Sequence, residues 1–211
     1  MNSFSNFIKK NVLFLIFYLL SVLLVIVLKM NYSKEKLHLM LTSWHNSFSD
    51  SFFSIITNIG DGVFVIIVGV LLAFYKVKNG LLIISSFLLT GLIVQILKNY
   101  VFPDARRPFL HFQNPELLHQ VKDVNIHIHN SFPSGHTASA FVLFFSLSIL
   151  TGKKYLQITF FFMAALVSYS RVYLSQHFIE DIYAGSAIAI FITTLLYFII
   201  FRKETDITYK N

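Results

Sequence analysis

The sequence of 211 residues contains no cysteine, few prolines and few charged residues. The lack of cysteine excludes disulfide bonds, thiolate metal sites and a cysteine nucleophile. Charged side chains make up only 13% of the chain and apolar ones 55%, and the mean hydropathy is +0.67. A soluble domain of this length needs more charge on its surface. The composition therefore predicts a single membrane-embedded domain that spans residues 1–211.

Six apolar segments approach the length needed to cross a bilayer. A helix needs about 20 apolar residues to span ~30 Å of hydrocarbon, and a crossing segment must satisfy its backbone polar groups internally. We therefore expect an all-α, polytopic fold with six transmembrane helices at about 12–28, 55–75, 80–98, 135–151, 155–174 and 182–201. The second segment is interrupted by Asn58, Gly60, Asp61 and Gly62, which leaves its start open.

The sequence also predicts how the chain begins and what connects and follows the helices. The first apolar run follows Lys9 and Lys10 without a small-residue cleavage site, which predicts a retained anchor rather than a signal peptide. Residues 31–54 have an amphipathic pattern that predicts an interfacial helix, with a polar loop as the alternative. Residues 99–134 hold four of the eight histidines and are expected to form a functional loop. Residues 202–211 are expected to be a solvated tail.

The cations indicate how the chain is oriented. Six crossings place both termini on one side of the membrane, together with nine of the 17 cations. This nearly even division of the cations does not by itself decide the orientation. The very short loops with Lys76 and Lys78 and with Lys153 and Lys154 favour a cytoplasmic location for that side. Cations between apolar runs also fit an anionic membrane ligand better than nucleic acid.

Three polar patches fall at helix ends that this topology brings to the outer face. They are residues 98–108, 133–137 and 170–181. Their cations are Lys98, Arg106, Arg107 and Arg171. Charges near hydrocarbon are costly and usually functional, and guanidinium and ammonium groups bind phosphate oxygens. Taken singly, Lys98 could snorkel to the interface and Arg106 could be a solvated loop charge.

The second patch begins a helix. Pro133 precedes Ser134, a natural N-cap, and an apolar run follows. The free N–H groups and positive dipole end of a helix N-terminus bind phosphate, and Gly135 lets a ligand approach the backbone. A plain capped helix is the alternative before His136 is considered.

The third patch pairs His177 with Asp181, four residues apart. On a helix both side chains lie on one face and can meet. A carboxylate at one ring nitrogen fixes the tautomer and leaves the other nitrogen free to attack. Glu180 would point about 100° away, so Asp181 is the expected partner. A satisfied interfacial histidine is the alternative.

Together, the patches resemble the motifs of the type 2 phosphatidic acid phosphatases, a family related to the vanadium haloperoxidases. The second motif of the family is matched by Pro133-Ser134-Gly135-His136, and the third by Ser170-Arg171, His177 and Asp181. In the first motif, eight residues separate Lys98 from Arg107, a longer spacing than is usual in the family. Arg107 matches because Pro108 follows it, and Arg106 could share its role.

The resemblance implies a membrane phosphatase that acts on a lipid phosphate without a metal or other cofactor. The phosphoryl oxygens would be bound by Lys98, Arg107, Ser134, Gly135 and Arg171. His177 would attack phosphorus and form a phosphohistidine, with Asp181 orienting its ring. His136 would protonate the leaving oxygen and then help to activate water.

Several functional hypotheses fit this resemblance. The candidate substrates are undecaprenyl pyrophosphate, phosphatidylglycerol phosphate, phosphatidic acid and a lipid A phosphate, with a polyprenyl pyrophosphate slightly favoured by the breadth of the family. A lipid phosphotransferase would use the same intermediate, and a non-catalytic lipid-binding membrane protein is the alternative from another class. We expect a bacterial inner-membrane location, with the site facing the periplasm or the exterior. The sequence predicts no oligomeric state.

Overall fold

The part of the chain that the structure describes is helical throughout. The computed structural model describes residues 2–122 and 124–202, and these contain no strand. The long helices are α2 (Val12–Asn31), α5 (Gly62–Tyr75), α6 (Val77–Ile96), α8 (Gly135–Thr151), α9 (Lys154–Tyr173) and α10 (Ile179–Ile200). The short elements are α1 (Asn2–Lys10), α3 (Lys34–Thr42), α4 (Ser47–Ile56), η1 (Thr57–Gly60), η2 (Leu97–Val101), α7 (Pro108–His111) and η3 (Pro115–Leu117). The predicted all-α class is confirmed; residues 203–211 of the predicted tail lie outside the described residues.

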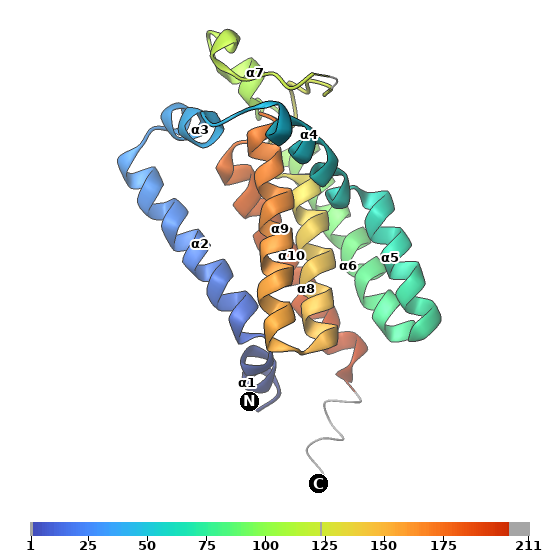
Figure 1. Ribbon diagram of the computed structural model, residues 1–211. Coiled ribbons are helices and arrows are strands. Elements are labelled where there is room, and N and C mark those ends of the chain that lie inside the picture. Colours follow the sequence, from blue (N-terminus) through green and yellow to red (C-terminus); the bar gives the residue numbers. More distant parts are fainter. Residues whose placement is uncertain (1, 123, 203–211) are drawn as a thin grey trace.

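The long helices form one bundle, and short helices gather at one of its ends (Figure 1). α8 packs against α6, α9 and α10, while α5 packs along α6 and α2 along α9. α3, α4 and α7 lie at the end of the bundle opposite α1. The segments predicted to carry chemistry therefore share the end that these three short helices cover.

Length and hydropathy identify fewer crossings than the six expected. Three helices are long and apolar enough to span a bilayer: Val12–Asn31, Val77–Val101 and Ile179–Ile200. A fourth span results if Ser47–Gly60 and Gly62–Tyr75, which meet at 54°, are counted together. α8 is apolar but has only 17 residues. The apolar helices support an integral membrane protein, but these criteria do not establish six crossings.

Aromatic side chains fill the middle of the bundle. Phe14 of α2 is fully buried, and its ring centroid lies 4.9 Å from that of Phe145 and 5.7 Å from that of Phe161. Such pairs add attraction beyond the area that they bury. Gln157 of α9 also holds α2, because it accepts from Leu13 N–H at 3.1 Å and donates to the Lys10 carbonyl at 2.5 Å. α2 is thus joined to the core at its N-terminal end.

The segment predicted as one interfacial helix, 31–54, contains two helices. Ser33 caps α3 by accepting from Lys36 N–H at 3.2 Å, and Asn46 caps α4 by accepting from Ser49 N–H at 2.9 Å. Capping side chains of this kind satisfy N–H groups that lack helical partners, so the second cap starts a new helix. Helix α1 was not predicted from the sequence, because it lies outside the apolar runs.

The open start of the second predicted crossing is explained by a break at Asp61. The Asp61 carboxylate accepts from Val63 N–H at 2.8 Å and so caps α5. The polypeptide before it forms α4 and η1 rather than a continuation of α5. Asp61 consequently lies at a bend between helices, near the start of α8.

We predict that Gly185→Ala destabilises the protein. A Cβ at Gly185 of α10 would overlap the carbonyl oxygen of Ser134, a backbone atom that cannot rotate away. Overpacking of this kind costs about 1–3 kcal/mol, so the thermal midpoint in detergent should fall. Gly91→Ala is the matched control because its Cβ would meet nothing within 4 Å. Equal midpoints for the two variants would contradict the close approach of α10 to Ser134.

Candidate active site

The position of His177 is set by the turn between α9 and α10. Ser175 in this turn has a left-handed backbone, with φ of 49°. The turn is closed by the backbone N–H of His177, which donates to the Arg171 carbonyl over 3.1 Å. Two residues that are six positions apart in sequence, Arg171 and His177, are thereby fixed at the same end of the bundle.

Asp181 orients the His177 ring. Its Oδ2 atom lies 3.2 Å from His177 Nδ1, and it accepts from Phe178 N–H at 3.0 Å and from the Ser131 hydroxyl at 2.5 Å. An ionised carboxylate can only accept, so the ring proton lies on Nδ1 and Nε2 keeps its lone pair. His177 therefore has the tautomer that a nitrogen nucleophile requires.

The predicted His177–Asp181 pair is present, but its geometry comes from a capping turn rather than from one helix face. α10 begins at Ile179, so His177 precedes the helix and Asp181 occupies its first turn. The carboxylate that caps the Phe178 N–H is also the one that meets the imidazole. The helix starts three residues before the predicted 182 because Asp181 supplies this cap.

His177 is uncharged at neutral pH. Its side chain is only 2% exposed, and burial lowers the pKa of the ring to about 3. Asp181 acts in the opposite direction, and the nearby guanidinium groups of Arg107 and Arg171 add to the effect of burial. Because protonation is disfavoured well below pH 7, the ring remains available as a nucleophile.

Three cations surround this pair, and their hydrogen-bond acceptors within the described residues are neutral. Arg107 donates from Nε to the His129 carbonyl at 2.8 Å and from a terminal nitrogen to the Gln176 carbonyl at 3.2 Å. Lys98 Nζ donates to the Asn130 carbonyl at 2.8 Å. These partners hold the side chains in place without cancelling their charge.

Arg171 differs from the other two cations in having a buried nitrogen without a hydrogen-bond partner among the described residues. Its side chain is buried, and one terminal nitrogen donates to Thr57 Oγ1 at 2.7 Å. Its Nε has no hydrogen-bond partner within the described chain. A buried donor without a partner is costly and calls for an explanation, and a bound anion would satisfy it.

The start of α8 lies against the start of α10. Ser134 caps α8, since its hydroxyl accepts from Thr137 N–H at 3.4 Å, and the Ser134 N–H donates to the Asp181 carbonyl at 2.9 Å. Gly135 opens the helix, and a Cβ there would meet only Val94, at 4.0 Å. Unpaired N–H groups at a helix start favour a bound anion.

The structure separates the two neighbouring arginines of the first motif. Arg107 is 9% exposed and bonded as described, whereas Arg106 is exposed. The longer spacing before Arg107 coincides with a wide helical turn, η2, which contains Lys98. Lys98 is buried and lies close enough to Arg107, Arg171 and Asp181 to interact with them electrostatically. The structure therefore brings Lys98 into the cluster and leaves Arg106 at the surface.

His136 lines a cavity of about 180 Å³ beside this cluster. The cavity lies between η1, α5, α6 and α8, and its lining includes Gly60, Gly62, Thr90 and Gly135. His136 interacts electrostatically with three cations of the cluster, Arg171, Arg107 and Lys98. The two histidines of the predicted site are thus on the same side of the bundle and share the same cations.

Three side chains that support the site were not among the residues predicted from the sequence. Ser131 bonds to Asp181, Gln176 accepts from Arg107 at 3.1 Å, and Thr57 accepts from Arg171. Ser131 and Gln176 stand next to matched motifs, so their position was a usable signal. Thr57 lies far away in the sequence, and only the fold brings it to Arg171.

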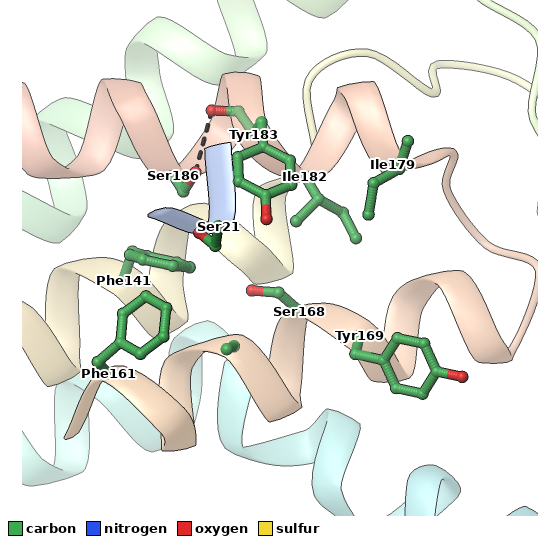
Figure 2. Close-up of a pocket in the computed structure, with 10 residues that line it drawn as sticks. Ser21, Phe141, Phe161, Ser168, Tyr169, Ile179, Ile182, Tyr183 and Ser186 are labelled. Carbon is green, nitrogen blue, oxygen red and sulfur yellow. Dashed lines mark hydrogen bonds between the residues drawn. The ribbon is translucent and has the colours of Figure 1, made fainter. Parts of the chain in front are cut away.

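A second cavity has a different character. This hollow has a volume of about 190 Å³, and its lining includes no charged side chain. Its lining residues come from α2, α8, α9 and α10 (Figure 2). Its serines bond to carbonyls of their own helices, as Ser186 does to Tyr183 and Ser168 to Ala164. It offers no group for phosphate chemistry, which singles out the cation cluster as the candidate active site.

Comparison with known proteins identifies the family. The model of the PAP2 superfamily matches residues 79–205, which include all three motifs and more than half of the chain. The chain belongs to the PAP2 superfamily. The predicted resemblance is therefore confirmed.

The matched relatives include phosphatases. A lipid A 4'-phosphatase of Porphyromonas gingivalis is 30% identical over 168 residues, covering 78% of this chain and 71% of the relative. An undecaprenyl-diphosphatase of Sulfolobus acidocaldarius is 33% identical over 124 residues, covering 58% of this chain and 56% of the relative. The crystal structure of LpxE from Aquifex aeolicus matches with a TM-score of 0.64 and 26% identity, covering 76% of this chain and 92% of that one. This PAP2 protein is a membrane phosphatase.

We predict that Ser131→Ala slows the enzyme without unfolding it. The variant removes one of the donors to Asp181 Oδ2 and leaves the carboxylate its bonds to His177 and Phe178. A hydrogen bond to a charged group contributes about 1.5–3 kcal/mol, so kcat should fall about ten-fold or more. Phosphate release measures this effect. Ser51→Ala is the control, because Ser51 is exposed and its hydroxyl donates to the Ser47 carbonyl of its own helix. An equal rate in both variants would contradict a supporting role for Ser131.

Proposed function

We propose that this PAP2 protein hydrolyses a phosphate ester or pyrophosphate on a lipid through a phosphohistidine at His177. One observation carries this proposal. The neutral, buried His177 is oriented by Asp181 and lies among cations whose hydrogen-bond acceptors are neutral, so excess positive charge surrounds a nucleophile. Such an arrangement favours an electrophile that carries negative charge, and a phosphoryl group has both properties.

The proposed reaction has two steps. In the first, His177 Nε2 forms a bond to phosphorus while the bond from phosphorus to the leaving oxygen breaks, and His136 gives that oxygen a proton. Lys98, Arg107, Arg171, Ser134 and the Gly135 N–H stabilise charge on the other phosphoryl oxygens. In the second, water attacks phosphorus as the bond from phosphorus to His177 Nε2 breaks, and the water passes a proton to His136. This step releases inorganic phosphate and restores both histidines.

We further propose one domain with six crossings, formed by α2, α5, α6, α8, α9 and α10. α8 and α9 extend side by side through the bundle, which supports counting them with the helices of sufficient hydropathy. The short loops with Lys76 and Lys153 lie in sequence between pairs of these helices, so the positive-inside rule assigns that end to the cytoplasm. The active site would then face the periplasm or exterior of a bacterial inner membrane.

The relatives guide the choice of substrate. The relative named as a lipid A 4'-phosphatase covers most of this chain, which favours a lipid A phosphate as the first substrate to assay. The undecaprenyl-diphosphatase supports undecaprenyl pyrophosphate as the second. Phosphatidylglycerol phosphate and phosphatidic acid complete the panel. A lipid phosphotransferase would differ in requiring an acceptor lipid before phosphate leaves its donor.

The central test is His177→Ala. Phosphate release from the four purified lipids in detergent, without an acceptor lipid, should be readily measurable for the wild type. Loss of the nucleophile should reduce it at least about a thousand-fold for every lipid. His45→Ala is the matched control, because His45 is exposed and its ring stacks on that of His119, away from the cation cluster. Wild-type turnover by folded His177→Ala would remove His177 from the reaction.

A second test concerns the charge chemistry of the site. Vanadate, which adopts the five-coordinate geometry of the transition state, should inhibit competitively with the lipid. Excess chelator should leave activity unchanged, since the proposed cations do the electrostatic work of a metal. Activity that disappears with chelator and returns with a divalent metal would contradict this scheme.

A further inference from the structure

The general acid of the proposed reaction faces an electrostatic difficulty. His136 must carry a proton to give it to the leaving oxygen, but Arg171, Arg107 and Lys98 all act on it. Like charges disfavour the protonated form of an imidazole. The cations that bind phosphate thus oppose the group that must deliver the proton.

One carboxylate opposes these cations. Among the charged groups that reach His136 from the described elements packed around it, Asp61 is the anion. Asp61 lies between Gly60 and Gly62, both of which line the same cavity as His136. It belongs to the break between η1 and α5, so its position is set by helix geometry rather than by a long loop.

The backbone approach at this point is unusually close. A methyl group on Gly60 would lie 2.8 Å from the His136 carbonyl oxygen and 3.3 Å from its Cβ. Only a residue without a side chain allows η1 to come so near to α8. This contact places the next residue, Asp61, beside the start of α8.

Asp61 also has a second role, as the N-cap of α5. Its Oδ1 atom accepts from Val63 N–H at 2.8 Å and caps α5. Asparagine caps a helix about as well as aspartate, whereas alanine does not. A change to asparagine therefore removes the charge and keeps the cap.

We propose that Asp61 is a positioning residue that stabilises the protonated form of His136 and so supports proton transfer to the leaving oxygen. This inference rests on the proposed function and extends it. The proton moves from His136 to the oxygen as the bond from phosphorus to that oxygen breaks, and Asp61 itself exchanges no proton. Asp61 is exposed, so water and salt weaken its effect.

The test compares two leaving groups. An alkoxide leaving from a lipid phosphate needs a proton, whereas p-nitrophenolate leaves readily without one. Asp61→Asn should lower kcat/KM for the lipid phosphate about two- to five-fold, the range of an exposed charge pair. It should leave kcat/KM for p-nitrophenyl phosphate within experimental error of the wild type. The basic limb of the pH profile for the lipid should move to lower pH, and the difference should shrink at high salt.

Two variants complete the design. Asp104→Asn removes another exposed carboxylate, one that is not among the groups that reach His136, and should behave as the wild type. Asp61→Ala should match Asp61→Asn in its leaving-group dependence and also lower the thermal midpoint, because it loses the cap. An Asp61→Asn variant that slows both substrates equally, or neither, overturns the inference while the nucleophilic role of His177 stands. Turnover of both substrates by His177→Ala would instead remove the proposed function and this inference together.

Discussion

Asp181 is the residue at which the end of the long loop, the turn before α10 and the start of α8 meet. Oδ2 accepts from the end of the long loop through Ser131, from the His177 ring and from the N–H of Phe178, the residue before α10. The Asp181 carbonyl accepts from Ser134 at the start of α8. Since these bonds share one residue, Asp181 holds the start of α8 close to His177, the proposed nucleophile. Gly185 allows this by letting α10 approach the Ser134 peptide.

Around this point the protein keeps positive charge that it does not neutralise. Arg107 and Lys98 donate to backbone carbonyls and Arg171 to a hydroxyl, so the cluster is held in place but remains cationic. Burying unpaired charge is expensive, and the apolar bundle supplies the packing that tolerates it. The same excess of charge that we propose binds phosphate opposes the protonation of His136. We propose that a carboxylate close to His136, but outside the phosphate-binding cluster, offsets this effect. Asp61, at the break between η1 and α5, occupies such a position.

The sequence was informative where chemistry is encoded locally. The pairing of His177 with Asp181 and the cap at Ser134 follow from neighbours within a few residues, and the family follows from their motifs. The predictions were less accurate where local patterns compete. One amphipathic segment became α3 and α4 because Asn46 can cap a helix, and α10 began early because Asp181 can. The length of apolar runs likewise predicted six crossings, of which hydropathy and helix length alone support three or four.

Sequence by itself determined the all-helical class, the family and the residue types of the site, because apolar periodicity and short motifs depend on neighbours along the chain. Only the tertiary structure decided which residues meet. Arg171 bonds to Thr57, more than one hundred residues away in the sequence, and Ser131 bonds to Asp181, fifty residues away. Arg106 is exposed, whereas its neighbour Arg107 is buried in the cation cluster. These contacts depend on how helices pack, and the close approaches at Gly60 and Gly185 set that packing through backbone atoms that no motif records.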